Sequence, residues 1–277
     1  MLDTMILDSF SRLCASEIDA LAQERLEDGA FDRTLWDKVE SLGLPGLLTD
    51  YEGELEAPQR AAQAVAMLAG YHSLPLPLAE NMIAREALAR AGIDAPAGLL
   101  AIGMLEGRLA SRIGDEAAPT VHGHGVIPWA RHADHLVIAL RAGHDEGIAL
   151  VPRDARGSTI TAARNLAAEP RDRIDFQATP CIRYVSLPGC VEWLALQSAR
   201  FRAALIAGAA ESALDLTVGY VKDRVQFGKP IGKFQAVQQS LATMAGELTS
   251  AHSACSLAFS LKAPDWRLVA VAKMRAD

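Results

Sequence analysis

Apolar positions follow a helical pattern through the last third of the chain. The segment from Trp193 to Asp223 contains no proline, and its two isolated glycines, Gly208 and Gly219, are compatible with a helix. The next segment repeats apolar or small residues in alternating steps of three and four, at Phe234, Val237, Leu241, Met244, Leu248, Ala251, Cys255 and Ala258. Such steps are typical of the seam of a helix bundle, so two long helices are predicted to pack side by side.

A third helix is predicted to follow Pro264, with Asp265 as its cap. Its sequence, DWRLVAVAKMRAD, reaches Asp277 without a glycine or proline that would end a helix. Two and a half helices leave the apolar stripes of a bundle uncovered. We therefore expect either that the protein continues beyond Asp277 or that a partner covers these stripes.

Between about residue 118 and residue 191 the pattern changes to short apolar runs rich in β-branched residues. Turn-forming glycines and prolines separate these runs, which are HLVIAL (135–140), GIALVP (147–152), STITAA (158–163) and CIRYVSL (181–187). We expect a small antiparallel β domain here.

The first part of the chain, to about residue 110, is predicted to be helical. Apolar residues keep rough helical spacing after Phe31, and a helix from Asn81 to Ala91 is bounded by Pro77 and Gly92. The predicted fold is mainly α. It has an N-terminal helical domain (1–112), a small antiparallel β domain (113–191) and a C-terminal helix bundle (192–277) that is incomplete at residue 277.

Composition narrows the functional class. The chain has 27 basic and 34 acidic residues, so it lacks the cationic surplus that would hold a nucleic-acid backbone. Its four cysteines are scattered without a CxxC motif, which indicates reduced thiols. The N-terminal sequence MLDTMILDSFSRL lacks the positive charge of a signal peptide, and no apolar run approaches the ~20 residues of a membrane span. A soluble cytoplasmic protein is predicted.

The connection between the two long helices, RVQFGKPIGKFQAVQ (224–238), carries the candidate chemistry. Its glycines allow positive φ or close backbone approach, and its proline prevents the helix from continuing. An arginine fork suits phosphate oxygens, an aromatic ring offers a flat apolar surface, and an amide can bind the edge of a purine. Arg224, Phe227 and Gln235 would together suit a dinucleotide. In the alternative interpretation, Arg224 caps the carbonyls at the helix end and Phe227 fills the turn.

This connection resembles a signature of the acyl-CoA dehydrogenase family, which has the spacing R-x-x-F-G-x-x-[IL]-x-x-x-Q. The resemblance rests mainly on DRVQFGKPIGKFQAVQQSLATMAGEL and extends to FDRTLWDKVESLGLPGLL, GVIPWARHADHLVIAL and SLAFSLKAPDWRLVAVAK. The order of an α domain, a β domain and an α bundle also matches. The chain is identified from these segments as a short, divergent member of the family.

The resemblance implies FAD as cofactor and assigns roles at the connection. The pyrophosphate-binding arginine of the family falls on Arg224, its ring-stacking phenylalanine on Phe227 and its adenine-side glutamine on Gln235, while Gln226 takes the place of a further polar contact. In the family these residues reach a FAD held mainly by the neighbouring subunit. The implied activity is α,β-dehydrogenation of an acyl-CoA thioester, with an electron-accepting flavoprotein as redox partner.

Two departures from the family lie in the predicted β domain. The loop RLASRIGDEAAPTVH (108–122) lacks the Thr-Glu-Pro and Gly-Ser-Asp motifs expected there. The flavin-wall motif Trp-x-Thr falls near residues 126–128, beside Trp129. Trp129 is either a displaced substitute or a core residue, and the core interpretation is favoured. The missing motifs suggest the divergent members that act on bulky acyl groups such as steroid side chains.

The third departure is that no general base is visible, so the catalytic residue stays unknown. One family position for the glutamate falls on Ser198 and Ala199, which cannot abstract a proton. The other would lie beyond residue 277 or in a partner subunit. The nearest glutamates are Glu192 and Glu211. Glu211 shares a helix face with Asp215, and this face is expected to be solvated. Arg200 and Arg202 lie near a substrate-contacting arginine of the family without aligning to it.

The histidines offer little metal chemistry. His122 and His124 alternate with glycines and have no third ligand nearby in sequence, so no metal site is predicted. His252 is expected to be packed or hydrogen-bonded at the bundle seam.

The uncovered seam and the missing loop motifs together predict an oligomer, a dimer of dimers. It is either homomeric or built with a related subunit that supplies the other half of a shared flavin site. A non-catalytic partner subunit in such a heteromer is the alternative function.

Overall fold

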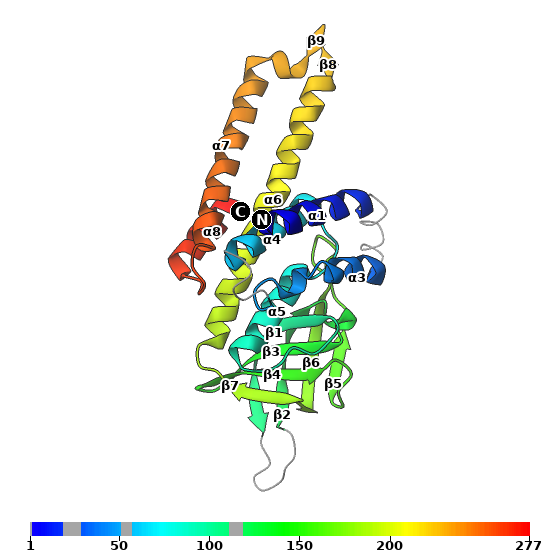
Figure 1. The fold of residues 1–277 in the computed structure, drawn as a ribbon, viewed down its shortest axis with the longest axis vertical. Coiled ribbons are helices and arrows are strands. Elements are labelled where there is room, and N and C mark those ends of the chain that lie inside the picture. The colour runs from blue at the N-terminus through cyan, green and yellow to red at the C-terminus, as the bar shows by residue number, and fades with distance from the viewer. Residues whose placement is uncertain (1, 19–28, 51–56, 111–118) are drawn as a thin grey trace. The chain divides into compact units, whose positions relative to one another are not determined.

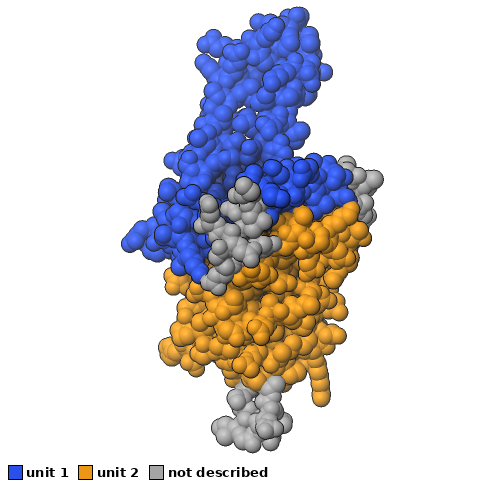
Figure 2. Space-filling view, in the orientation of Figure 1, with its two compact units in different colours: residues 1–18, 56–74, 199–277 blue, residues 19–55, 75–198 orange. Residues whose placement is uncertain are grey.

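A computed structural model describes residues 2–18, 29–50, 57–110 and 119–277 of the chain. These residues form two compact units, shown in different colours in Figure 2. The helical unit comprises residues 1–18, 56–74 and 199–277, and the sheet unit comprises residues 19–55 and 75–198. The three-part division at residues 112 and 191 remains a prediction.

The helical unit contains five helices in its described part (Figure 1). They are α1 (Leu2–Glu17), α4 (Pro58–Tyr71), α6 (Cys190–Asp223, of which residues from 199 belong to this unit), α7 (Gln235–Ala258) and α8 (Trp266–Ala276). Asp265 caps α8 as predicted, because its side chain accepts hydrogen bonds from the N–H groups of Arg267 and Leu268. The three C-terminal helices expected from the apolar pattern are therefore confirmed.

Helices α4 and α6 cross at two glycines. A Cβ placed on Gly70 would lie 1.9 Å from the carbonyl oxygen of Leu205, and one placed on Gly208 would lie 1.9 Å from that of Met67. No side chain fits at such a distance, so each helix uses its glycine to let the other backbone approach. Gly208, which the sequence shows only as a tolerated glycine, is thus a packing residue.

The sheet unit is built on a seven-stranded sheet with the order β5-β6-β2-β1-β3-β4-β7. Its strands are β1 (Leu100–Ala110), β2 (Thr120–Pro128), β3 (His135–Ala142), β4 (Asp145–Pro152), β5 (Ser158–Thr161), β6 (Arg171–Pro180) and β7 (Arg183–Ser186). The helices α3 (Arg33–Ser41) and α5 (Leu78–Arg90), the short turns η1 (Leu44–Gly46) and η2 (Ala130–His132) and the start of α6 complete its described part.

Two expectations about the sheet are wrong. The strand β1 occupies residues that were predicted to be helical, and it runs parallel to β3, so the sheet is mixed instead of purely antiparallel. The sequence of β1, LAIGMLEGRLA, lacks β-branched enrichment, and its pairing with β2 and β3 decides its conformation. The expectation of a mainly α chain is not confirmed.

The central strands β3 and β4 are buried on both faces of the sheet, because residues 136–140 and 147–151 are buried without interruption. On β6, nearer the edge of the sheet, buried residues such as Ile174 and Phe176 alternate with exposed ones, so this strand turns one face to the core. Trp129 is only 2% exposed and packs its ring near Phe31 and His132, which confirms the core interpretation of this tryptophan.

All four cysteines are buried and free. Burial raises the pKa of the Cys14 thiol to about 12 and that of the thiols of Cys181, Cys190 and Cys255 to about 11. These thiols are therefore protonated and unreactive near neutral pH. They act as small apolar core residues.

Helix α6 is long and apolar enough to cross a membrane by length and composition alone. Its polar side chains instead contact other helices of the helical unit. Arg200 is fully buried and donates to the side chain of Gln59 (2.8 Å) and to the carbonyl of Leu261 (3.1 Å). Asp215 accepts a hydrogen bond from the hydroxyl of Tyr71 (3.0 Å). These contacts identify this part of α6 as a bundle helix.

The start of α6 is capped from the sheet by Glu146 of β4. Its carboxylate accepts hydrogen bonds from the backbone N–H of Gly189 (2.9 Å) and Val191 (3.5 Å) and from Nε of Arg141 (2.9 Å). Burial raises the pKa of Glu146, but the hydrogen bonds from Arg141 and the two N–H groups outweigh burial and hold the pKa below its ordinary value of 4.5. Glu146 therefore stabilises the fold as an anion.

We expect Glu146→Gln to lower the free energy of unfolding by about 1 kcal/mol at pH 7, the usual size of a lost helix cap. Because the pKa is lower in the folded protein, this contribution is complete above pH 4.5 and is lost as the pH falls through the folded-state pKa. Urea unfolding of both proteins between pH 7 and pH 3 measures the difference. A gap between them that stays constant down to pH 3 would contradict this role.

Candidate functional site

The distal halves of α6 and α7 run side by side as an arm, defined here as residues 209–250 (Figure 1). Within the arm only Val221 is buried, at 6% exposure. Large apolar side chains lie open on it, including Leu216 (72% exposed) and Tyr220 (60% exposed). Exposed apolar surface of this extent is typical of an interface.

A small β hairpin joins the two helices at the tip of the arm, defined here as residues 222–235. Its strands β8 (Val225–Gln226) and β9 (Lys229–Pro230) pair antiparallel around the two-residue turn Phe227-Gly228. The short helix η3 (Ile231–Lys233) follows and leads into α7. The connection is thus a hairpin and not a bare turn between helices.

The glycines of the tip have different roles. Gly228 adopts a φ of +80°, as the sequence predicts for a turn glycine. Gly232 does not have a positive φ. A Cβ placed on it would lie 3.1 Å from the carbonyl oxygen of Val221, so this glycine permits close approach to the end of α6. The backbone N–H of Ile231 donates to the carbonyl of Arg224 (2.9 Å) and closes the hairpin.

The tip presents its polar and aromatic side chains outward. Phe227 is 91% exposed. Arg224, Gln226 and Gln235 are also exposed, and their side chains make no hydrogen bond or ion pair with the described residues. The alternative in which Arg224 caps the helix and Phe227 fills the turn is therefore wrong. The four predicted site residues are grouped and exposed at one end of the helical unit, and their role in binding remains a prediction.

The tip is also positively charged in an acidic protein. Residues 222–233 contain four cations (Lys222, Arg224, Lys229 and Lys233) and one carboxylate (Asp223), a formal charge of +3, whereas the chain as a whole carries −7. This contrast attracts anions to the tip. A guanidinium for phosphate oxygens, a ring for stacking and two free amides fit a flavin dinucleotide.

Two acidic residues of α6, Glu211 and Asp215, have partners in the helical unit. Oε2 of Glu211 lies 3.5 Å from Nε2 of His252 on α7, in line with the expectation of a contact for His252. Asp215 is exposed and accepts a hydrogen bond from Tyr71, and the side chain of Glu211 is 43% exposed, so the two carboxylates lie on a solvated face as predicted. Glu192 is exposed in the first turn of α6. None of these contacts identifies a general base.

Arg200, one of the two arginines near the substrate-contacting position of the family, has a structural role. Arg200 lies under the turn between α7 and α8, and its guanidinium stacks on Phe259 at 4.7 Å from the ring centroid. Ser198 and Ala199 precede it and carry no carboxylate. Catalytic residues thus stay unassigned.

His122 and His124 lie on β2. Nδ1 of His122 accepts a hydrogen bond from the N–H of Ala178 (3.3 Å), so this ring is engaged within the sheet. In the described parts of the chain no group of three or more metal-binding side chains occurs.

Most of the loop at 108–122, where the family motifs are missing, lies outside the described residues because 111–118 are not described.

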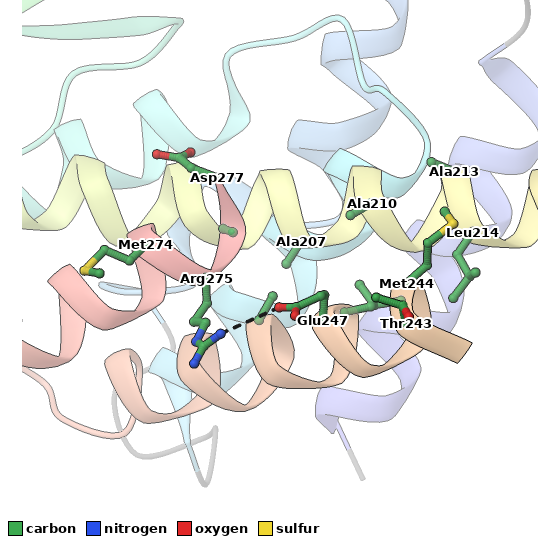
Figure 3. Close-up of a pocket in the computed structure, with 13 residues that line it drawn as sticks. Ala207, Ala210, Ala213, Leu214, Thr243, Met244, Glu247, Met274, Arg275 and Asp277 are labelled. Atoms are coloured by element: carbon green, nitrogen blue, oxygen red, sulfur yellow. Dashed lines mark ion pairs between the residues drawn. The ribbon is translucent and has the colours of Figure 1, made fainter. Parts of the chain in front are cut away.

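The sequence did not reveal an apolar groove between α6, α7 and α8 (Figure 3). It has a volume of about 460 Å³ and a floor of small and apolar side chains such as Ala210, Leu214 and Leu248. An ion pair between Glu247 and Arg275 (3.6 Å) crosses its edge. The residues of α6 and α7 that line the groove recur every three or four positions. The bundle seam predicted from the sequence is therefore present and partly open.

The family model and two relatives that match this chain all concern acyl-CoA dehydrogenases. Residues 192–277 match the model of the acyl-CoA dehydrogenase C-terminal domain. Acyl-CoA dehydrogenase IpdE2 of Mycolicibacterium smegmatis is 39% identical over 106 residues, which are 36% of this chain and 33% of the relative. Acyl-CoA dehydrogenase FadE27 of Mycobacterium tuberculosis is 28% identical over 250 residues, which are 82% of this chain and 64% of the relative. In both, the match spans less than two thirds of the relative's own length.

Solved structures share the fold over nearly the whole chain. Butyryl-CoA dehydrogenase from Megasphaera elsdenii superposes with a TM-score of 0.85 at 19% identity, covering 99% of this chain and 84% of that one. The ChsE4-ChsE5 complex from Mycobacterium tuberculosis gives a TM-score of 0.79 at 19% identity, covering 99% of this chain and 82% of that one. At these identities the likeness concerns the fold.

Proposed function

Since the chain belongs to the acyl-CoA dehydrogenase family, we propose that it is a FAD-dependent acyl-CoA dehydrogenase acting on an acyl-CoA thioester. The observation that carries the proposal is the tip of the arm. It places a guanidinium, an exposed ring and two amides together in a positive field, and the guanidinium and the amides make no hydrogen bond or ion pair with the described residues.

Each side chain of the tip has a role in holding the dinucleotide. The Arg224 guanidinium binds pyrophosphate oxygens through charge-assisted hydrogen bonds. Phe227 supplies an apolar face for a ring, and the amides of Gln226 and Gln235 donate to or accept from the polar edges of the nucleotide. FAD, when bound, supplies the hydride acceptor for α,β-dehydrogenation.

The arm also supports an oligomer. Its exposed apolar residues and the protruding tip suit a site shared between subunits, in a dimer of dimers with an electron-accepting flavoprotein as redox partner. We propose a soluble cytoplasmic enzyme of lipid metabolism. The acyl group is left open, with bulky groups such as steroid side chains favoured because the β-domain loop lacks the family's motifs.

A second function is a non-catalytic subunit that completes the flavin site of a related partner. It is favoured by Ser198 and Ala199, which take one family position of the general base without a carboxylate able to abstract the α-proton. The fold is also shared with a structure described as a complex of two named chains, ChsE4 and ChsE5. The flavin-binding tip is required in both functions, whereas turnover by this chain is required only in the first.

The test is to purify the full-length protein, alone and co-expressed with any similar neighbouring reading frame. We expect a yellow protein that reduces an artificial electron acceptor with at least one acyl-CoA of a panel that includes steroid side-chain thioesters. Flavin binding without turnover by the lone chain, but with turnover by the pair, would support the partner function. A protein that stays colourless in FAD-supplemented buffer in both forms would contradict both functions.

A further inference from the structure

Phe227 has a backbone conformation that phenylalanine does not prefer. Its φ is +52° and that of Gly228 is +80°, so both central residues of the two-residue hairpin turn lie in the left-handed region. This is the pattern of a type I′ turn, in which Asn, Asp and Gly are favoured because a Cβ is otherwise crowded. A residue kept in such a conformation at a binding site is a sign that its placement matters.

Phe234, six residues after Gly228, contacts the ring of Phe227 from the side. The two ring centroids are 6.2 Å apart with an angle of 89° between the planes, an edge-to-face contact. Nζ of Lys229 lies 4.5 Å from the centroid of the Phe234 ring. Both contacts are attractive, because the positive edge of one ring and the ammonium group each favour the negative face of an aromatic ring.

Phe234 is itself well anchored. It is partly buried and stands at the N-cap of α7, where its carbonyl accepts the N–H of Gln238 (3.1 Å) and its own N–H donates to the carbonyl of Ile231 (3.1 Å). These hydrogen bonds hold the backbone of Phe234, whose ring contacts Phe227, at a fixed place at the helix start. Phe227, by contrast, is almost fully exposed and makes no other ring contact with the described residues.

We propose that Phe234, supported by Lys229, is a positioning residue that orients Phe227 before the flavin dinucleotide binds. The inference rests on the proposed function, because it takes Phe227 as the residue that stacks on the cofactor. An exposed side chain that is already oriented loses less rotamer freedom on binding, so the dinucleotide binds more tightly. Phe234 acts through Phe227 and does not need to touch the cofactor.

The orientation can be observed without cofactor. Flavin-free protein labelled with 4-fluorophenylalanine gives one 19F signal for each phenylalanine, of which this chain has seven, and Phe227→Leu identifies the signal of Phe227. We expect Phe234→Leu to shift the Phe227 signal by removing the ring current of its neighbour. Phe234→Tyr keeps a ring at the same place and serves as the matched control, with the Phe227 signal close to its original position.

Flavin affinity is then measured by fluorescence titration of the same proteins, together with the subunits they assemble with. Phe234→Leu is expected to weaken FAD binding on the order of three- to tenfold, the equivalent of one lost edge-to-face contact, while Phe234→Tyr retains the original affinity.

Weaker binding without any change in the Phe227 signal would mean direct contact of Phe234 with the cofactor and would overturn the positioning role. A shifted signal with unchanged affinity would overturn it as well. If the unaltered protein binds no FAD, the proposed function itself fails, and this role with it, whatever the 19F signals show.

Discussion

Gly208→Ala is expected to destabilise the helical unit by about 1–3 kcal/mol or more, the cost of forcing extra volume into a packed contact. The added Cβ would lie 1.9 Å from the carbonyl oxygen of Met67, which belongs to a helix backbone and cannot rotate away as a side chain can. The helices α4 and α6 must separate to admit the methyl group. Their separation also removes contacts around Gly70 of α4, which lies against the backbone of Leu205 of α6 at the same crossing.

Gly219→Ala is the matched control, because it makes the same chemical change in the same helix. A Cβ on Gly219 would meet no atom within 4 Å. Here the higher helix propensity of alanine is expected to raise the free energy of unfolding by up to about 1 kcal/mol. Urea unfolding followed by circular dichroism measures both variants. Equal effects of the two substitutions would show that the crossing does not limit the stability of the unit.

Arg224→Ala is expected to weaken FAD binding by about tenfold to a hundredfold. A hydrogen bond to a charged group contributes about 1.5–3 kcal/mol, and the exposed guanidinium of Arg224 has no other described partner that competes with the pyrophosphate. The variant should fold normally for the same reason, since its side chain makes no hydrogen bond or ion pair with the described residues. The flavin content of the purified protein and a FAD titration of its flavin-free form measure the loss.

Arg267→Ala, on α8, removes the same charge from an exposed position away from the tip and controls for the change in net charge. It should retain flavin. Higher salt should weaken FAD binding to the unaltered protein and do so less for Arg224→Ala, because a phosphate contact is screened by salt. Equal loss of flavin in the two variants would indicate a general electrostatic effect and would remove Arg224 from the site.

The candidate site was largely readable from the sequence because its chemistry is local. Arg224, Gln226, Phe227 and Gln235 lie within twelve consecutive residues, and the glycines and proline between them dictate a reversal of the chain. The positive φ at Phe227 was not predictable. Steric preference assigns that position to Asn, Asp or Gly, and the edge-to-face contact of Phe227 with Phe234 is visible only in the tertiary structure.

The sequence by itself determined the long helices and four of the strands, because apolar spacing and turn residues act over a few neighbours. Tertiary structure alone decided the conformation of β1, whose leucines, alanines and glycines suit a helix or a strand and become a strand by pairing with β2 and β3. It likewise decided the role of Gly208. Identical glycines at 208 and 219 in one helix differ only in what lies opposite them, and a backbone from elsewhere in the chain is a contact that no local pattern encodes.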